Sequence, residues 1–377
     1  MKTIFRRSSP VMTLIIVLTC CQDLPSPYDD TDAVIESRME ALNANGLIGC
    51  TFEGDQVTWI NAYGFADRET QTEMTVDTAF QIGSISKVIT GIAALQLFEQ
   101  NALDLDKGIN TYLATAISHP DFPNTAITAR MLLTHTAGII DNWELLSGLW
   151  GPGRSGYPLE DAVKNYFSAA GIWYDPDNNY SDEKPGTVWA YTNAGIGLLG
   201  YLVEIISGVP FEEYTRQYIL DPLGVSGGWF LDEIGPSNLV TPYDAEGNAL
   251  ANDQGVFFPA GSYITTSRDL VKIMGIFANG GVSQGQRIIK SETVDLMLQG
   301  HYEAGDQYQG LILYRTPFTV DGQTVIGHAG TLDGIETQAF FSNSTNKGAI
   351  FFTNTRFAFP FSAFEILKAL VIKAEAL

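Results

Sequence analysis

Apolar and polar residues along this chain alternate with two different periods, which predicts both helices and strands. Residues 33–45 have helical spacing, with apolar side chains at Val34, Ile35, Met39 and Leu42. The apolar stretches 47–52 and 57–63 predict two strands joined by a turn at Gly54-Asp55. Residues 88–98 are apolar nearly all round, a pattern typical of a buried central helix.

The middle of the chain, from about residue 103 to 243, is rich in helical patterns and Gly/Pro loops and shows no clear strand pairs. Its clearest helices are 196–206 and 211–220, and another helix is predicted at 270–278. Beyond it we predict five strands and a closing helix: 308–314, 318–320, 324–326, 337–341, 349–353 and then 361–374. Strands at both ends with helices between them favour one sheet built from both chain ends, with an inserted helical lobe at roughly 103–250.

The first thirty residues form a separate pattern. Three basic residues precede an apolar run from Val11 to Leu18, which is shorter than the about 20 residues that span a bilayer. This order is typical of an export signal. Cys20 and Cys21 follow, and the segment resembles a bacterial lipoprotein signal whose cysteine is lipidated; an ordinary secretory signal with incidental cysteines is the alternative.

We therefore expect a signal over residues 1–20, a solvated tether over 21–32 and one folded domain over 33–377. The expected location is outside the cytoplasm, in the periplasm or on the outer surface, with a lipid anchor as the contact with the membrane.

Composition narrows the class of protein further. The 377 residues are 45% hydrophobic and 17% charged, with 21 Phe, 16 Tyr and 6 Trp, which excludes a disordered chain. The net charge of −22 argues against non-specific nucleic-acid binding, which needs a basic surface. Removing residues 1–20 takes away three positive charges and no negative ones, which leaves −25. Of the three cysteines, Cys50 is expected to be a small buried apolar residue.

Two serines occur in the pattern G-x-S-x-G, at Ser226 and Ser283. That motif needs a preceding strand and a following helix, so that the serine stands on a strained turn. Both serines follow helical stretches here and precede no helix, so we interpret both as loop residues. The four histidines are scattered, and no zinc, P-loop or dinucleotide pattern stands in the right context. We expect no metal and no cofactor.

The stronger candidate is Ser84-Ile-Ser-Lys87, which leads into the apolar helix. One turn of helix would bring the Lys87 amine to the Ser84 hydroxyl, and a serine needs such a base to act as a nucleophile. A lysine becomes a useful base when burial lowers its pKa. A serine N-cap with a solvated lysine is the alternative, but a charge opening an apolar helix is costly without a purpose.

Two further segments fit this chemistry. Tyr191-Thr-Asn193 precedes the helix at 196–206; the tyrosine can relay a proton and the asparagine can donate to a carbonyl, although a simple helix cap is the alternative. His328-Ala-Gly330-Thr331 follows the predicted strand 324–326, where glycine would let a substrate lie against the strand edge. A surface turn is the alternative for this segment.

Together and in this order, the three segments resemble the serine β-lactamase-related hydrolases: class C β-lactamases, penicillin-binding D-alanyl-D-alanine carboxypeptidases, and related esterases and D-aminopeptidases. The resemblance covers roughly residues 33–370 and extends to flanking segments: Tyr63-Gly-Phe-Ala-Asp67, Phe80-Gln-Ile-Gly-Ser-Ile-Ser-Lys87, Leu132-Leu-Thr-His-Thr-Ala-Gly138, Pro185-Gly-Thr-Val-Trp-Ala-Tyr191 and Asp221-Pro-Leu-Gly224. It implies an α/β (α+β) fold, an antiparallel sheet flanked by helices with an inserted all-helical lobe.

The resemblance also implies roles. Ser84 would attack a carbonyl and become acylated, Lys87 and Tyr191 would share the proton transfers, and Asn193 would position a small-molecule or peptide substrate. The backbone N–H groups of Ser84 and Thr331 would form the oxyanion hole. A nearby Lys87 cation would favour the Tyr191 phenolate, and His135 is expected to be structural.

One departure from the family pattern bears on the substrate. Class C β-lactamases usually have Lys-Thr-Gly where this chain has His328-Ala-Gly330. The site therefore loses a fixed positive charge and a hydroxyl, because histidine is mostly neutral at pH 7. Both losses weaken the case for a substrate with a free carboxylate. We expect a peptidase or esterase rather than an efficient β-lactamase, with an inactive binding protein on the same fold as the alternative.

Overall fold

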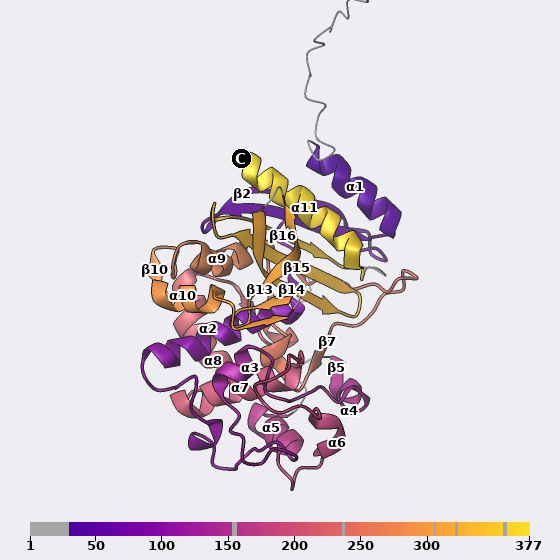
Figure 1. Ribbon diagram of the computed structural model, residues 1–377. Coiled ribbons are helices and arrows are strands. Elements are labelled where there is room, and N and C mark those ends of the chain that lie inside the picture. The colour runs from indigo at the N-terminus through magenta and orange to yellow at the C-terminus, as the bar shows by residue number, and fades with distance from the viewer. Residues whose placement is uncertain (1–29, 153–156, 236–237, 305–306, 321–322, 357–359) are drawn as a thin grey trace, which may run out of the picture.

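The computed structural model describes residues 30–152, 157–235, 238–304, 307–320, 323–356 and 360–377 (Figure 1). The predicted signal, both N-terminal cysteines and nearly all of the predicted tether lie outside the described residues. The chain forms a large sheet covered by helices on both faces, with a helical region on one side of it (Figure 1).

The sheet has nine antiparallel strands in the order β11-β12-β13-β14-β15-β16-β1-β2-β3. Their bounds are β1 Gly46–Glu53, β2 Gln56–Asp67, β3 Thr72–Glu73, β11 Tyr302–Ala304, β12 Gln307–Gln309, β13 Tyr314–Val320, β14 Gln323–Leu332, β15 Ile335–Ser342 and β16 Lys347–Thr353. The two ends of the chain meet where β1 pairs with β16, with Leu47 opposite Thr353 and Cys50 opposite Ile350. The prediction of one sheet built from both chain ends is therefore confirmed.

The central strands are buried on both faces because helices cover each one. Side chains alternate between faces along β1, so Leu47 packs under α1 (Thr31–Leu42) and α11 (Pro360–Ala376), while Ile48 joins the core on the other side. Figure 1 shows α1 and α11 together on the outer face. Cys50 is fully buried as a free thiol, and burial raises its pKa to about 12. It therefore behaves as the expected apolar residue.

The opposite face of the sheet packs on α9 (Ser267–Ala278), which contacts β1, β2, β15 and β16, and on the turn Gly83–Ile85, which contacts β14 and β15. The remaining helices are α2 Ser86–Glu99, α3 Ala129–Leu133, α4 Trp143–Leu146, α5 Leu159–Phe167, α6 Pro176–Asn179, α7 Asn193–Ser207, α8 Phe211–Thr215 and α10 Ser291–Leu298. As its sequence predicts, α2 is buried on all sides, from Ser86 to Leu97. The helical region also holds short strands: β4 Phe80–Gln81, β6 Gly227–Gly228 and β8 Ile264–Thr265 in one sheet, and the pair β5 Trp150–Pro152 and β7 Asp253–Gly255.

Several predicted elements differ from the structure. The expected strand 308–314 is wrong, because Leu311, Ile312 and Leu313 are buried as a loop in which the Ile312 N–H donates to the Leu133 carbonyl. The expected helix 211–220 is present, but only its first part is α-helical: α8 ends at Thr215, and a π-helix follows over Arg216–Leu220. Helix α10 was not expected. Strand β14 continues to Leu332, six residues beyond the prediction.

None of the helices in the described residues combines the length and the apolar composition that a membrane crossing requires. Helix α7 and the segment Phe211–Leu223 meet that criterion only as a pair bent by 79°, by length and composition alone.

Candidate active site

Ser84 and Lys87 meet at the start of the buried helix. Ser84 lies in a 3₁₀ turn, Gly83–Ile85, which runs directly into α2. The Lys87 Nζ lies 2.9 Å from the Ser84 Oγ, so the spacing of one turn does bring the two groups together. The solvated-lysine alternative is wrong, because Lys87 is 0% exposed.

The surroundings of Lys87 make it a base rather than a fixed cation. Its Nζ also lies 2.7 Å from Asn193 Oδ1 and 2.6 Å from the Ala260 carbonyl, so three oxygens surround it. Burial lowers the pKa of Lys87 to about 7, against the opposing charge of Asp141, which raises it. Near pH 7 a large fraction of this amine is therefore neutral and able to accept a proton from Ser84.

Asp141 holds Asn193 in place at the N-terminus of α7. Its carboxylate accepts hydrogen bonds from the Asn193 backbone and side-chain N–H groups and from the Ala194 N–H, at 2.8–2.9 Å. It also accepts from the Thr192 hydroxyl at 3.0 Å, and Thr192 caps the helix. An acid at this position is stabilised by the free N–H groups and the helix dipole. Asp141 was missed at the sequence level, because it lies 52 positions from the asparagine that it holds.

Tyr191 borders the same group, but its expected ionisation is not found. The Lys87 Nζ lies over the face of its ring, 4.8 Å from the ring centre, while the tyrosine hydroxyl forms a hydrogen bond with Ser84. Burial raises the pKa of Tyr191 above its ordinary value, and the hydrogen bond with Ser84 offsets this only in part. The expectation of a favoured phenolate is therefore wrong. The pKa of Tyr191 is thus shifted toward the neutral phenol, opposite to the direction that we expected.

His135 supports the tyrosine segment from behind. Its ring packs against the Tyr191 ring with centroids 4.5 Å apart, and its Nδ1 accepts from the Thr192 N–H at 3.4 Å. Its backbone carbonyl accepts from the Ala190 N–H at 2.7 Å. Burial and the charge of Lys87 lower the pKa of His135 well below its ordinary value. This neutral histidine fixes residues 190–192, in agreement with the structural role expected for it.

The third segment lies inside a strand, not in the surface turn considered as its alternative. His328 is 2% exposed in β14, and burial with the nearby Lys87 lowers its pKa to about 3. Its Nδ1 lies 2.6 Å from the Ala329 carbonyl, which can only accept, so Nδ1 carries the proton and Nε2 is an acceptor. The position that holds a lysine in class C β-lactamases is therefore an uncharged imidazole.

Gly330 allows β14 to lie against the turn that carries Ser84. A Cβ on Gly330 would come within 2.1 Å of the Ile82 carbonyl oxygen and 2.5 Å of the Thr337 hydroxyl. Gly83 has a φ of +53°, and a Cβ there would lie 3.0 Å from the Thr331 nitrogen. These glycines thus serve the contact between two protein segments, whereas the sequence suggested room for a substrate. Thr331 is exposed at the same edge.

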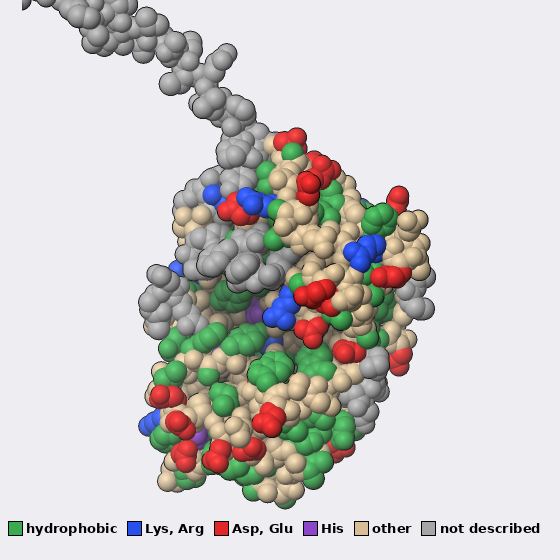
Figure 2. All heavy atoms as spheres, turned by 90° about the vertical axis from the view of Figure 1, so that its right-hand side faces the viewer, with side chains coloured by type: hydrophobic (Ala, Val, Ile, Leu, Met, Phe, Trp, Pro, Cys, Tyr) green, Lys and Arg blue, Asp and Glu red, His purple; other side chains and the backbone are tan. Residues whose placement is uncertain are grey.

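A cleft of about 630 Å³ opens over these groups, between the sheet and the helical region. Figure 2 shows a face hollowed between the two halves, where hydrophobic, basic and histidine side chains border the hollow. The lining combines the predicted residues with others from distant segments: Ser84, Trp143, Trp189, Tyr191, Asn193, Tyr308, Gln309, Tyr314, Arg315, His328, Ala329 and Thr331. Arg315 is the one positively charged side chain among these described lining residues, and its guanidinium lies 3.7 Å from the centre of the Tyr308 ring.

The other candidate serines lie elsewhere. Ser283 is in strand β9 (Val282–Ser283), fully buried, and its hydroxyl donates to the Lys272 carbonyl at 2.6 Å. Ser226 is exposed just before β6. Neither serine precedes a helix. Among the described residues, no group of three or more His, Cys, Asp or Glu side chains is arranged to hold a metal ion.

Comparison with known proteins was made on both sequence and structure. A family model described as Beta-lactamase matches residues 31–370. Penicillin-binding protein 4 of Amycolatopsis lactamdurans is 27% identical over 251 residues, or 63% of this chain and 61% of that protein. Esterase EstB of Burkholderia gladioli is 25% identical over 276 residues, or 66% and 64%. The alignments thus span less than two thirds of either relative.

The fold of this chain is similar to that of a solved structure. The D-alanine carboxypeptidase AmpC from Burkholderia cenocepacia has a TM-score of 0.71 at 19% identity, covering 92% of this chain and 99% of that one. At this identity the likeness concerns the fold alone. The match of the family model to nearly the whole described chain carries the assignment. This chain belongs to the Beta-lactamase family of serine hydrolases.

Proposed function

We propose that this protein is a serine hydrolase that forms an acyl-enzyme at Ser84 from an amide or ester substrate. The observation that carries the proposal is the buried Lys87 amine, 2.9 Å from the Ser84 hydroxyl and with a pKa lowered to about 7. A serine beside a base of that pKa is an activated nucleophile near neutral pH.

In acylation, the Ser84 Oγ forms a bond to the substrate carbonyl carbon while its proton passes to the Lys87 amine. The negative charge that develops on the carbonyl oxygen is held by the backbone N–H groups of Ser84 and Thr331, and Asn193 donates to the substrate. The bond to the leaving group then breaks, and the leaving group takes a proton from Lys87 by way of the Tyr191 hydroxyl. A neutral phenol suits this relay because it donates one proton and accepts another.

In deacylation, a water molecule attacks the acyl-enzyme, and Lys87 again accepts and returns the proton. The water gives a proton to the Lys87 amine and attacks the ester carbon, and Ser84 recovers its proton as the acyl group leaves as an acid. His328 lines the cleft from β14, and Gly330 lies two residues further along the same strand. The uncharged His328 imidazole offers an acceptor at Nε2 rather than a cation. We therefore place esterase or peptidase activity before efficient β-lactamase activity, and one relative of this chain is named an esterase.

A second candidate, cleavage of a peptide that ends in a free carboxylate, is favoured by Arg315. This cation lines the cleft on β13 and can replace the charge missing from His328. Arg315→Gln should then weaken turnover of a D-Ala-D-Ala peptide about tenfold or more and leave a neutral ester unaffected. Equal effects on both substrates would contradict this candidate.

Labelling with a fluorophosphonate and with a fluorescent penicillin tests the principal proposal. We expect Ser84→Ala to abolish the label, and Lys87→Ala to reduce it at least 10²-fold without loss of the folded state. Ser226→Ala is the matched control, because this exposed serine lies in the other type of hydrolase motif. No Ser84-dependent label with either reagent would favour an inactive binding protein instead. Turnover of a D-Ala-D-Ala peptide, a cephalosporin and a p-nitrophenyl ester then ranks the activities.

We further propose that the protein is exported and lipid-anchored through Cys20 or Cys21. The support is the basic start, the short apolar run and the two cysteines of the sequence. Membrane fractionation of the full chain should show partitioning that is lost when both cysteines become serine. Partitioning that persists in that double variant would refute the lipid anchor.

A further inference from the structure

A buried glutamine on the sheet side of the cleft is linked to the segment that carries Tyr191. We propose that Gln309 and Trp189 are positioning residues, which hold the Tyr191 hydroxyl where it can pass a proton to the leaving group. This inference rests on the proposed acyl-enzyme function, and it names the residues on which cleavage of poor leaving groups depends.

The orientation of the Gln309 side chain follows from its partners. Gln309 ends β12 and is 3% exposed. Its Nε2 lies 3.1–3.3 Å from three backbone carbonyl oxygens, those of Gly310, Ile312 and Leu313. Its Oε1 lies 3.3 Å from Trp189 Nε1. Backbone carbonyls only accept and an indole N–H only donates, so the amide oxygen must point to Trp189.

The turn that this amide holds is strained and packs on α2. Ile312 has a φ of +69°, which a branched side chain rarely adopts, and a hydrogen bond of 2.9 Å closes a three-residue turn around it. A Cβ on Gly91 of α2 would lie 2.8 Å from the Ile312 side chain. The glutamine therefore connects Trp189 to a turn that is fixed on the helix at whose start the catalytic serine and lysine lie.

Trp189 in turn supports Tyr191. It lies two positions before Tyr191 in the sequence, and the centres of the two rings are 6.1 Å apart. The His135 ring contacts both, with its centre 4.5 Å from that of Tyr191 and 6.2 Å from that of Trp189. The Tyr191 hydroxyl forms a hydrogen bond with Ser84. A shift of the indole would therefore change the position of this hydroxyl relative to the reacting atoms.

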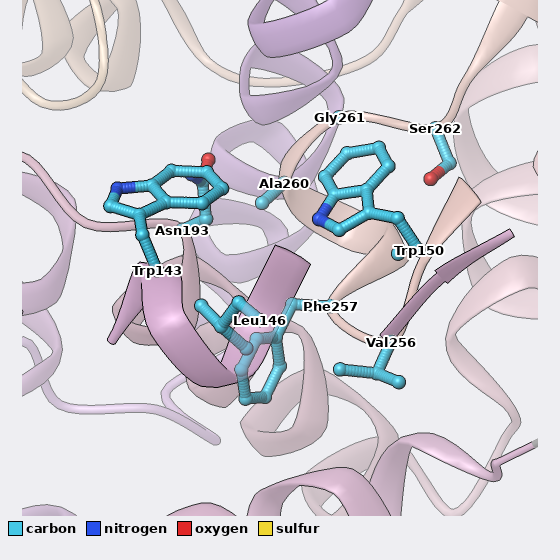
Figure 3. Close-up of a pocket in the computed structure, with 10 residues that line it drawn as sticks. Trp143, Leu146, Trp150, Asn193, Val256, Phe257, Ala260, Gly261 and Ser262 are labelled. Carbon is cyan, nitrogen blue, oxygen red and sulfur yellow. The ribbon is translucent and has the colours of Figure 1, made fainter. Parts of the chain in front are cut away.

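The two ends of the segment 191–193 have different supports. Figure 3 shows Asn193 beside the Trp143 indole, at a small pocket that these two residues share. This end is fixed by Asp141, whose Oδ2 accepts from Asn193 Nδ2 at 2.8 Å. The Tyr191 end is held by ring contacts and, through them, by the Gln309 amide. Loss of the amide link should therefore affect the tyrosine and leave the asparagine in place.

The chemical consequence concerns the leaving group. p-Nitrophenolate is a weak base and departs without a proton, whereas an alkoxide must be protonated as its bond to the carbonyl carbon breaks. In the proposed mechanism that proton comes from Lys87 through the Tyr191 hydroxyl. General acid catalysis of this kind contributes about 10²–10⁴ in rate. A displaced tyrosine should therefore slow an alkyl ester far more than a p-nitrophenyl ester, while a loss of folded protein would slow both equally.

The test compares kcat/KM for p-nitrophenyl acetate and ethyl acetate, which share the acyl group and differ in the leaving group. Trp189→Phe removes the indole N–H, and Gln309→Met removes the amide at similar side-chain length. We expect each change to lower kcat/KM for ethyl acetate about tenfold or more, and for p-nitrophenyl acetate less than about threefold. The double variant should show no further change in the ratio, because both changes break the same link.

Trp229→Phe and Gln96→Met are the matched controls. The Trp229 indole donates to the Thr215 hydroxyl at 2.8 Å, and Gln96 Nε2 donates to the Ile288 carbonyl at 3.0 Å. Each control thus loses the same kind of buried hydrogen bond, and neither residue lines the cleft. Both controls should lower the Tm and keep the wild-type ratio of the two kcat/KM values.

The outcomes separate this inference from the function on which it rests. A wild-type ratio in folded Trp189→Phe and Gln309→Met, while Ser84→Ala abolishes turnover of both esters, overturns the positioning role and leaves the hydrolase proposal intact. A control that shifts the ratio equally also overturns it. If Gln309→Met does not fold, Trp189→Phe decides alone, because it keeps the contacts of the glutamine with the carbonyls. Absence of any Ser84-dependent turnover or labelling overturns both proposals.

Discussion

At the scale of single residues, the chemistry of this site depends on which groups are charged. Lys87 has its pKa lowered to about 7, whereas the two histidines near it are held neutral because burial lowers their pKa values below the physiological range. Tyr191 stays protonated because burial raises its pKa. Within this group, only Lys87 therefore changes charge between pH 5 and 9.

The first prediction concerns the pH dependence of acylation. A lysine base must be neutral to act, so the rate should rise as pH increases through about 7 and level off above pH 8. Stopped-flow measurement of acylation by a p-nitrophenyl ester between pH 5 and 9 would reveal a single ascending limb. A rate that stays constant down to pH 5 would rule out Lys87 as the base.

A second prediction concerns Asp141, which we regard as a positioning residue. Its charge raises the pKa of Lys87, and its oxygens hold the Asn193 side chain. Asp141→Asn should therefore shift the ascending limb to lower pH and reduce the limiting acylation rate about tenfold or more. Glu144→Gln removes a nearby exposed acid and should alter neither quantity. If Asp141 had only a structural role, Asp141→Asn would lower the acylation rate without shifting the ascending limb of its pH profile.

At the scale of elements, the sequence predicted the helices better than the contacts between them. The apolar stretch of α2 and the periodic pattern of α1 were sufficient to locate both helices, since each signal is local. The length of β14 was underestimated because Gly327 and Gly330 resemble turn residues in a local reading. Glycine is needed at both positions because the backbone of β14 lies close to β15 and to Ile82. These contacts exist only in the folded chain.

The contact between β14 and the Ser84 turn leads to a third prediction. Gly330→Ala places a methyl group 2.1 Å from the Ile82 carbonyl, so it should lower the free energy of unfolding by about 1–3 kcal/mol and slow acylation about tenfold. Gly148→Ala is the matched control, because no atom lies within 4 Å of its added Cβ. Urea unfolding and acylation rates would check both variants. Equal stability of the two variants would contradict the steric explanation.

At the scale of the whole molecule, the sheet and the helical region share one apolar core. The largest buried cluster contains Ile48 and Phe52 from the sheet, Val88 and Ile92 from α2, and Phe167 from the distant helical region. Helix α2 thus joins the two halves instead of belonging to one of them. The catalytic groups sit at this junction, with Ser84 and Lys87 at the start of α2, Asn193 on α7 and His328 on the sheet.

A fourth prediction follows from the shared core. The two halves should unfold together, so tryptophan fluorescence and far-ultraviolet circular dichroism should give the same midpoint in a urea titration. Ile92→Ala should lower that midpoint for both probes by the same amount, at a cost of about 2–5 kcal/mol. Two separate transitions in calorimetry would show that each half has a core of its own.

The sequence by itself determined the elements with local signals, the order of the three catalytic segments and the family to which they belong. Ser84 and Lys87 could be paired in advance because one turn of helix separates them. Tertiary structure alone decided which distant groups surround them: Asp141 behind Asn193, Ala260 on the lysine and Arg315 in the cleft. It also decided the charges, because a pKa depends on burial and on neighbours that come from other parts of the chain. For that reason Lys87 could be expected to titrate low, but the neutral Tyr191 could not be foreseen.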